Sequence, residues 1–103
     1  AAIPLALGTD LNPGSSPVHD PWTVATLACV TQGMTIEEVV LGLTRVAGRA
    51  LGRSDLGWLG PKSVGDLALF APPPGEPADV AALVQHMGGH RTVAVIRDGR
   101  RVV

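Results

Sequence analysis

The chain opens with an apolar run that passes directly into a polar, glycine-rich stretch. Residues 2–7 are apolar without alternation, which is typical of a strand buried on both faces. Pro4 cannot donate to a strand ladder, so it fits the start of such a strand or a position paired on one side only. Residues 8–20 are rich in Gly, Pro, Ser and Asp and predict a loop. The pattern therefore places a polar loop at the end of a buried strand.

A first helix is predicted after this loop. Asp20 is a favourable N-cap residue and Pro21 suits the first helical position, so the helix should start there. It should run to about Gln32 and stop at Gly33, a residue that readily adopts the left-handed conformation common after helix ends. The segment is apolar nearly all round, which predicts that it is covered on more than one side.

A second helix follows, with a clear start signal. Thr35 and Glu38 have the spacing of a capping box. The apolar residues behind them recur at the spacing of one helix face: Ile36, Val39, Val40 and Leu43. Thr44 is predicted to cap a further helical segment that ends at Gly52.

The rest of the chain alternates turn-rich stretches with short apolar elements. The turns contain Gly, Pro, Ser and Asp, and Asp98-Gly99 has the composition of a two-residue hairpin turn. The expected elements are a turn region over 54–65, a strand over 66–70, an exposed proline-rich loop over 72–77, a helix over 78–87, a strand over 92–97 and a return strand over 100–103.

The composition suggests that some surfaces of this chain normally face other protein. The chain has 103 residues and is 46% hydrophobic, with a mean hydropathy of +0.29. A domain of this size has little interior in which to bury so much apolar matter. The strand at the front also needs neighbours, because an unpaired apolar strand is an aggregation hazard. We expect those neighbours in a partner chain or in sequence beyond this segment.

Charge and cysteine content exclude several classes of function. The net charge is −1 and the basic residues are scattered, so a nucleic-acid-binding surface is not expected. No apolar run reaches the length of a membrane span, and no membrane partner is expected. Cys29 is the single cysteine, which excludes a disulfide framework within the chain and fits a cytoplasmic protein.

The loop carries a resemblance to a known family. Residues 8–17 read GTDLNPGSSP and resemble the imidazolonepropionase family of the metal-dependent amidohydrolases. The Thr9-Asp10 pair is common to many amidohydrolases, whereas the Asn-Pro-Gly-Ser at 12–15 is more specific to this family. Further similar segments lie along nearly the whole chain: 34–38, 44–47, 56–60, 65–67, 83–86 and 95–100. The turn at 62–66 and the triple proline at 72–74 depart from the family pattern, both far from the loop.

The resemblance implies an α/β fold and a fragment of a larger enzyme. Residues 1–53 would be the last strand, active-site loop and helices of a (β/α)8 TIM-type barrel. Residues 54–103 would be part of a small carboxyl-terminal β-sandwich domain. A barrel alone takes about 250 residues, so this chain would be the carboxyl-terminal segment of a protein whose barrel portion is missing here. The full-length family member is expected to be a homodimer.

The resemblance also implies the chemistry of the loop. Asp10 would be a ligand to one divalent or trivalent metal ion, zinc or iron, and would accept a proton from water during hydrolysis. Asn12, Gly14 and Ser15 would contact the substrate, 4-imidazolone-5-propanoate, whose cyclic amide is opened to N-formimidoyl-L-glutamate in histidine degradation. From the residues alone, the favoured interpretation is that Asp10 caps a turn and that residues 12–15 form an ordinary loop.

Two other functions remain open from the sequence. Another amidohydrolase, such as a cyclic amidine deaminase, would share the Thr9-Asp10 pair. A non-catalytic domain that binds a partner through its apolar helix would suit the apolar composition. The other chemically active side chains are interpreted as structural or surface residues: His19, His86, His90, Cys29, Trp22, Trp58 and the arginines of the last hairpin, Arg97, Arg100 and Arg101.

Overall fold

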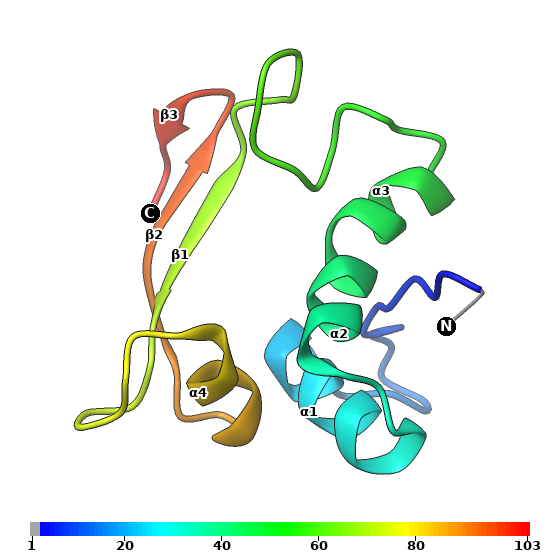
Figure 1. Cartoon of the computed structure of the whole chain (residues 1–103), viewed down its shortest axis with the longest axis vertical. Coiled ribbons are helices and arrows are strands. Elements are labelled where there is room, and N and C mark those ends of the chain that lie inside the picture. The colour runs from blue at the N-terminus through cyan, green and yellow to red at the C-terminus, as the bar shows by residue number, and fades with distance from the viewer. Residues whose placement is uncertain (1–2) are drawn as a thin grey trace.

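The structure is a computed structural model that describes residues 3–103. Helices α1–α3 lie on one side of the molecule and a sheet lies on the other, with α4 packed near one end of the sheet (Figure 1). The predicted α/β class is confirmed, and the assignment to a barrel end and a sandwich stays a prediction. The elements in order are α1 (Pro21–Gln32), α2 (Ile36–Leu43), α3 (Arg45–Ala50), β1 (Leu67–Ala71), α4 (Val80–Gln85), β2 (Arg91–Arg97) and β3 (Arg100–Arg101).

The predicted front strand is wrong for this chain. Ala2 lies outside the described residues, and residues 3–7 form no strand and join no ladder within residues 3–103. Ile3 is 73% exposed and Leu5 is 53% exposed, so the segment is not buried on both faces. It rests on α2 through a hydrogen bond from the Leu7 N–H to the Gly42 carbonyl, at 2.9 Å. A strand needs donors and acceptors beside it, and the described sheet lies elsewhere.

The first helix begins and ends where the sequence predicts. The Asp20 carboxylate accepts hydrogen bonds from the Trp22 and Thr23 N–H groups, at 3.2 Å and 3.1 Å. These bonds satisfy amide donors that have no partner inside the helix. Gly33 closes the helix with φ 68° in the left-handed region. The helix is covered by both α2 and α4, with Ala25 and Ala28 buried, whereas Val30 on its outer side is 78% exposed.

The capping box of α2 is confirmed, and the predicted cap of the next helix is not. The Glu38 N–H donates to Thr35 Oγ1, and the Thr35 N–H donates to the Glu38 carboxylate. The Thr44 side chain makes no cap bond to α3. Its hydroxyl donates instead to the Val40 carbonyl at 2.6 Å, as Thr and Ser often do inside helices. The helix ends at Ala50, two residues before the predicted stop.

The capping box yields a stability prediction. Replacing Thr35 by Ala should lower the free energy of unfolding by about 1 kcal/mol, because the Glu38 N–H loses its acceptor. Thr31→Ala is the matched control, since the Thr31 hydroxyl is exposed and donates only to the Leu27 carbonyl inside α1. The control should change stability by less than about 0.5 kcal/mol. Urea unfolding of the two variants compares them, and equal losses would contradict a capping role.

The sheet is antiparallel in the order β1-β2-β3. Leu67 pairs with Ile96 at one end of β1, and the register shifts between Leu69 and Phe70. The predicted hairpin turn is confirmed, with Asp98 at φ 50° and Gly99 at φ 74°. Such left-handed residues match the twist of the strands that they join. The return strand is shorter than predicted and is assigned only at Arg100–Arg101.

The fourth helix is shorter than the predicted 78–87. It runs from Val80 to Gln85, and Asp79 precedes it as the N-cap residue, accepting from the Ala82 N–H at 2.9 Å. After it, His86 leaves the helical conformation and Gly88 has φ 73°. The Asp79 carboxylate thus fixes the start of α4, and the Gly88-Gly89 pair lies just beyond its end.

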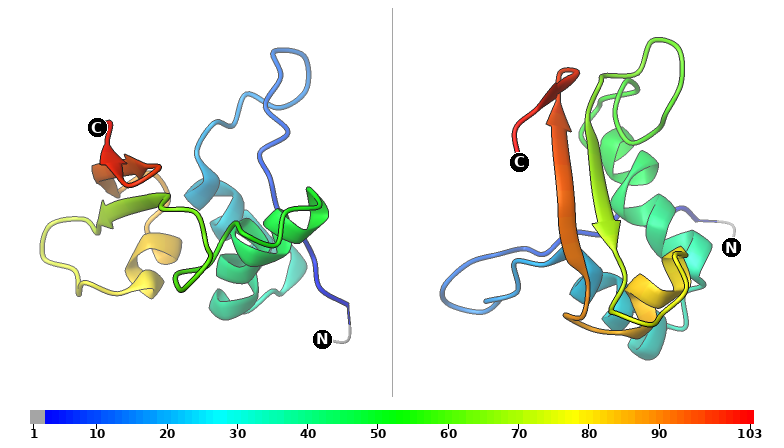
Figure 2. Two further views of the ribbon diagram at one scale, coloured as in Figure 1. Left: turned by 90° about the horizontal axis from the view of Figure 1, so that it is seen from above. Right: turned by 90° about the vertical axis from the view of Figure 1, so that its left-hand side faces the viewer.

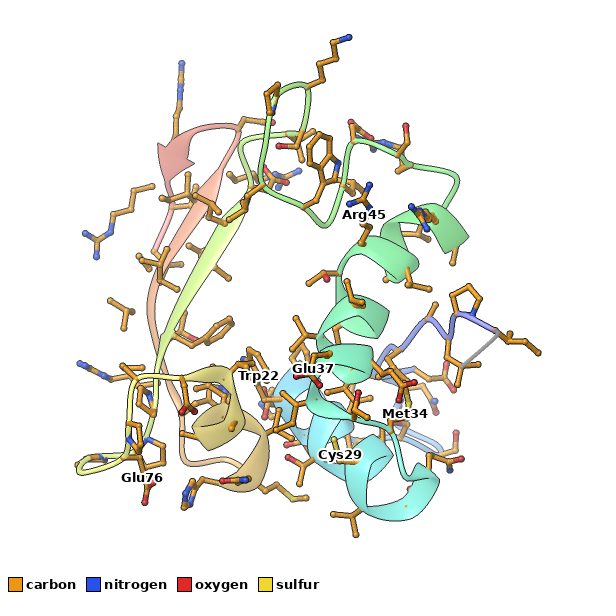
Figure 3. All side chains as sticks on the ribbon, viewed as in Figure 1. Trp22, Cys29, Met34, Glu37, Arg45 and Glu76 are labelled. Atoms are coloured by element: carbon orange, nitrogen blue, oxygen red, sulfur yellow. The ribbon has the colours of Figure 1, made fainter. Side chains whose placement is uncertain are left out.

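The core lies between α1, α2 and α4. It consists of Ala25, Ala28, Val39 and Val84, with partly buried neighbours packed around it. The buried Thr26 hydroxyl donates to the Val84 carbonyl at 2.6 Å and so joins α1 to α4. Trp22 lies between α1 and the sheet (Figure 3), edge-on to Phe70 of β1 with ring centres 5.4 Å apart. Among residues 3–103, no helix combines the length and the apolar character needed to cross a membrane.

Candidate functional site

The loop between the front segment and α1 is the candidate site. It projects away from the helices in both views of Figure 2. Its tip is closed by paired backbone hydrogen bonds between Asn12 and Ser16, with N–O distances of 2.9 Å and 3.3 Å. The Ser16 hydroxyl also donates to the Thr9 carbonyl at 2.7 Å. The loop therefore has a defined shape although most of it is exposed.

The Asn12 side chain organises the tip of the loop. Its Oδ1 accepts hydrogen bonds from the Gly14 N–H at 2.9 Å and the Ser15 N–H at 2.8 Å. Its Nδ2 donates to the Asp10 carbonyl at 3.0 Å. A Cβ at Gly14 would lie 3.3 Å from Asn12 Oδ1, tighter than most real contacts. The segment Asn-Pro-Gly-Ser at 12–15 thus folds into a turn that the side chain of its first residue, Asn12, holds together.

Asp10 lies at the start of the loop with its side chain exposed. Its φ is 49°, in the left-handed region that few residues other than glycine, Asn and Asp adopt. Within residues 3–103, no group donates a hydrogen bond to the Asp10 carboxylate. The oxygens therefore remain open to a ligand, as a catalytic or metal-binding carboxylate requires.

The donor set of this chain fits one ligand position of a metal site. A carboxylate oxygen is an ordinary ligand for zinc and for iron. No group of three or more His, Cys, Asp or Glu side chains gathers within residues 3–103 in a way that could hold an ion. Asp10 alone cannot hold a catalytic metal, so the remaining ligands would have to come from other protein.

Comparison with known proteins identifies the segment. No family model matches the chain. It is 39% identical to the imidazolonepropionase of Alteromonas mediterranea over 97% of its length, covering 23% of that protein. It is 41% identical to that of Ectopseudomonas mendocina over 81% of its length, and 46% identical to that of Xanthomonas euvesicatoria over 68%. The chain matches the carboxyl-terminal segment of the imidazolonepropionases.

The match confirms the resemblance carried by the loop motif. It covers only part of the matched proteins. The segment spans about a fifth of the length of the imidazolonepropionases that it matches, between 18% and 23%. The activity of such a whole protein therefore enters below as a proposal.

The structure brings the predicted site residues into one loop. Asn12, Gly14 and Ser15 share one turn, and Asp10 precedes them with its carbonyl bonded to Asn12. The sequence interpretation missed Ser16, whose hydroxyl holds the Thr9 carbonyl. A serine in a turn often bonds to a nearby backbone group, which is the signal that could have found it.

His90 has the structural role expected of it. Its ring packs against Trp22 and Phe70, with centres 6.5 Å and 5.6 Å away. Its Nε2 lies 3.3 Å from the Asp20 carboxylate, the same group that caps α1. His86 lies at the surface with its Nε2 3.4 Å from the Glu76 carboxylate. The His90 contacts join the chain just before β2 to β1 and α1, and the His86 contact joins the end of α4 to the loop that precedes it.

A charged pair in the turn region is also separate from the loop. The Arg53 guanidinium donates two hydrogen bonds of 2.7 Å to the two oxygens of Asp55. These hydrogen bonds lower the pKa of the exposed Asp55 carboxyl below its usual value. Nearby, the Arg45 guanidinium lies 5.6 Å from the centre of the Trp58 ring. Trp58 therefore has the packing role expected of it.

Proposed function

We propose that the full-length protein is an imidazolonepropionase that hydrolyses the cyclic amide of 4-imidazolone-5-propanoate to N-formimidoyl-L-glutamate. Identity of 39% over 97% of the chain to a protein of that name carries this proposal. The loop geometry supports it, because an open carboxylate precedes an ordered turn of small polar residues. Water adds to the ring carbonyl carbon, the carbon–nitrogen bond breaks, and a proton goes to the leaving nitrogen.

Asp10 would act in two ways in this reaction. Its carboxylate would provide one ligand for a zinc or iron ion, and the same group would accept the proton of the attacking water and pass it toward the leaving nitrogen. When bound, the ion supplies Lewis acidity toward the carbonyl and toward water. The exposed position of Asp10, with open carboxylate oxygens, supports both tasks.

The turn at 12–15 would form the substrate side of the site. Gly14 has no side chain to obstruct the approach of a ligand, and the Ser15 hydroxyl is exposed at the loop surface. The N–H groups of Gly14 and Ser15 donate to Asn12 in this structure, so they hold the shape of the turn. Substrate contact would then come from exposed side-chain and backbone edges of this preformed turn.

The exposure of the front segment supports the proposal that it is a strand of a barrel in the full-length protein. Hollows of about 440 Å³ and 430 Å³ are lined by residues of this segment together with α1, α2 and the residues that join them. Both include Leu5, Gln32 and Met34. If residues 1–53 are the end of a barrel, strands from the rest of the protein would pair with residues 2–7 and cover these apolar walls. Residues 54–103 would join the small β-sandwich, and homodimerisation stays a prediction.

A product assay on the full-length protein tests the proposed function. With 4-imidazolone-5-propanoate we expect N-formimidoyl-L-glutamate to form, and with cyclic amidines we expect no release of ammonia. Residues 1–103 alone should show no turnover, because Asp10 lacks the other metal ligands. Ammonia release from an amidine would instead identify a deaminase. A full-length protein without turnover on either class would favour a partner-binding role.

A further inference from the structure

Two side chains of the loop hold the peptide groups on either side of Asp10. The Ser16 hydroxyl donates to the Thr9 carbonyl at 2.7 Å, and Asn12 Nδ2 donates to the Asp10 carbonyl at 3.0 Å. The first bond fixes the peptide plane before the Asp10 Cα, and the second fixes the plane after it. Together they set φ and ψ of Asp10 and hence the direction of its Cα–Cβ bond.

We propose that Asn12 and Ser16 are positioning residues that aim the Asp10 carboxylate at the metal. This inference rests on the proposed role of Asp10 as a metal ligand. It assigns Asn12 a task other than substrate contact and gives Ser16 a role that the loop motif does not indicate. Supporting residues of this kind typically change metal affinity or activity by about 10- to 100-fold when they are removed.

The hydrogen-bonding capacity of Asn12 is used within the loop. An amide side chain offers two N–H donors and one oxygen with two acceptor sites. Oδ1 accepts from the Gly14 and Ser15 N–H groups. Nδ2 donates to the Asp10 carbonyl and to Ser15 Oγ, the latter at 3.1 Å. A substrate atom could bind this amide only by displacing one of these bonds.

The backbone of Asp10 needs such support. Its φ of 49° is in the left-handed region, which is less favourable than the right-handed one for a residue with a Cβ. The carboxylate receives no hydrogen bond from residues 3–103 that would orient it. Restraint of its direction within the described chain therefore comes through the two held carbonyl groups. A loop without these bonds would let Asp10 relax to a commoner conformation and turn the carboxylate away.

Ser16 and Ser15 offer a matched pair for the test. Both are serines of the same loop, and each loses one hydroxyl when replaced by Ala. The Ser16 hydroxyl bonds to the Thr9 carbonyl, whereas the Ser15 hydroxyl bonds only to the Asn12 side chain. Ser16→Ala should therefore disturb the Asp10 backbone, and Ser15→Ala should leave it in place. Ser16→Thr keeps a hydroxyl and should rescue the effect.

The experiment measures zinc affinity of the full-length protein by competition with a chelator, together with kcat and KM. We expect Ser16→Ala and Asn12→Ala to weaken zinc binding about 10-fold and to lower kcat, with KM changed less than about twofold. Ser15→Ala should raise KM and keep the zinc affinity. The Ser16 variant keeps the test valid if Asn12→Ala folds poorly.

Other results would overturn the inference. Unchanged zinc affinity in Ser16→Ala and Asn12→Ala, with a raised KM in the latter, would make Asn12 a substrate contact. Equal zinc loss in Ser15→Ala would indicate general damage to the loop. Asp10→Ala separates the two levels: if it loses zinc while Ser16→Ala does not, only this inference fails. If Asp10→Ala also keeps its zinc affinity, both the inference and the proposed ligand role fail.

Discussion

Asp10→Asn in the full-length protein is expected to lower kcat by about 10²- to 10⁴-fold, the range that a general acid–base group supplies. The amide has nearly the shape of the carboxylate, so the loop should keep its fold. It cannot accept a proton from water, and as a neutral group it is a weaker metal ligand. The measurements are steady-state turnover of 4-imidazolone-5-propanoate and the bound metal content of the purified variant.

Asp98→Asn is the matched control for this substitution. Asp98 is also exposed, and its φ of 50° is nearly that of Asp10. It lies in the hairpin turn between β2 and β3, away from the Asp10 loop. Its N–H donates a hydrogen bond to the Asp66 side chain. Asparagine is favoured in such a turn, so activity should stay near that of the unmodified protein. An Asp10→Asn variant with similarly unchanged turnover would refute the proposed role of Asp10.

Local signals explain why much of the fold could be predicted from the sequence. The caps at Asp20 and Thr35 act within four residues, and so does the turn at Asp98-Gly99. Each depends on one side chain or one glycine that meets the neighbouring backbone. Such features form in nearly any tertiary context, and the structure shows them where the pattern placed them.

The failed predictions share the opposite property. Residues 2–7 have the composition of a buried strand, but a strand depends on neighbours that this chain does not provide in its described part. Thr44 has the right residue type for a cap, but its hydroxyl is already bonded to the Val40 carbonyl. In both cases the outcome depends on a competing or absent partner, which local pattern does not encode.

The candidate site divides in the same way. The motif at 8–17 located the loop and named Asp10, Asn12, Gly14 and Ser15 as residues of interest. It could not show that Asn12 bonds to the Asp10 carbonyl, or that Ser16 holds Thr9. Those bonds exist only once the loop closes and Asp10 adopts a left-handed φ. Under the proposed function, the remaining metal ligands would lie outside this sequence, so no pattern within it could indicate them.

Gly57→Ala should lower the free energy of unfolding by about 3 kcal/mol or more. Gly57 has φ 76°, and a Cβ there would lie 2.3 Å from the backbone carbonyl of Thr44 and 2.6 Å from the Arg45 nitrogen. The left-handed conformation costs about 1–2 kcal/mol for a residue with a Cβ. Forcing a methyl group into a packed site adds about 1–3 kcal/mol. The obstructing atoms belong to the junction of α2 and α3, so a side-chain rotation cannot relieve the clash.

Gly52→Ala separates these two contributions. Gly52 has φ 72°, nearly that of Gly57, but nothing lies within 4 Å of a Cβ built there. Its replacement should cost only the left-handed strain. Thermal and urea unfolding of both variants in the full-length protein give the comparison, and equal losses would mean that Gly57 is not closely packed. Because φ is matched, the difference between the variants measures how tightly the turn region at 54–65 is packed against the junction of α2 and α3.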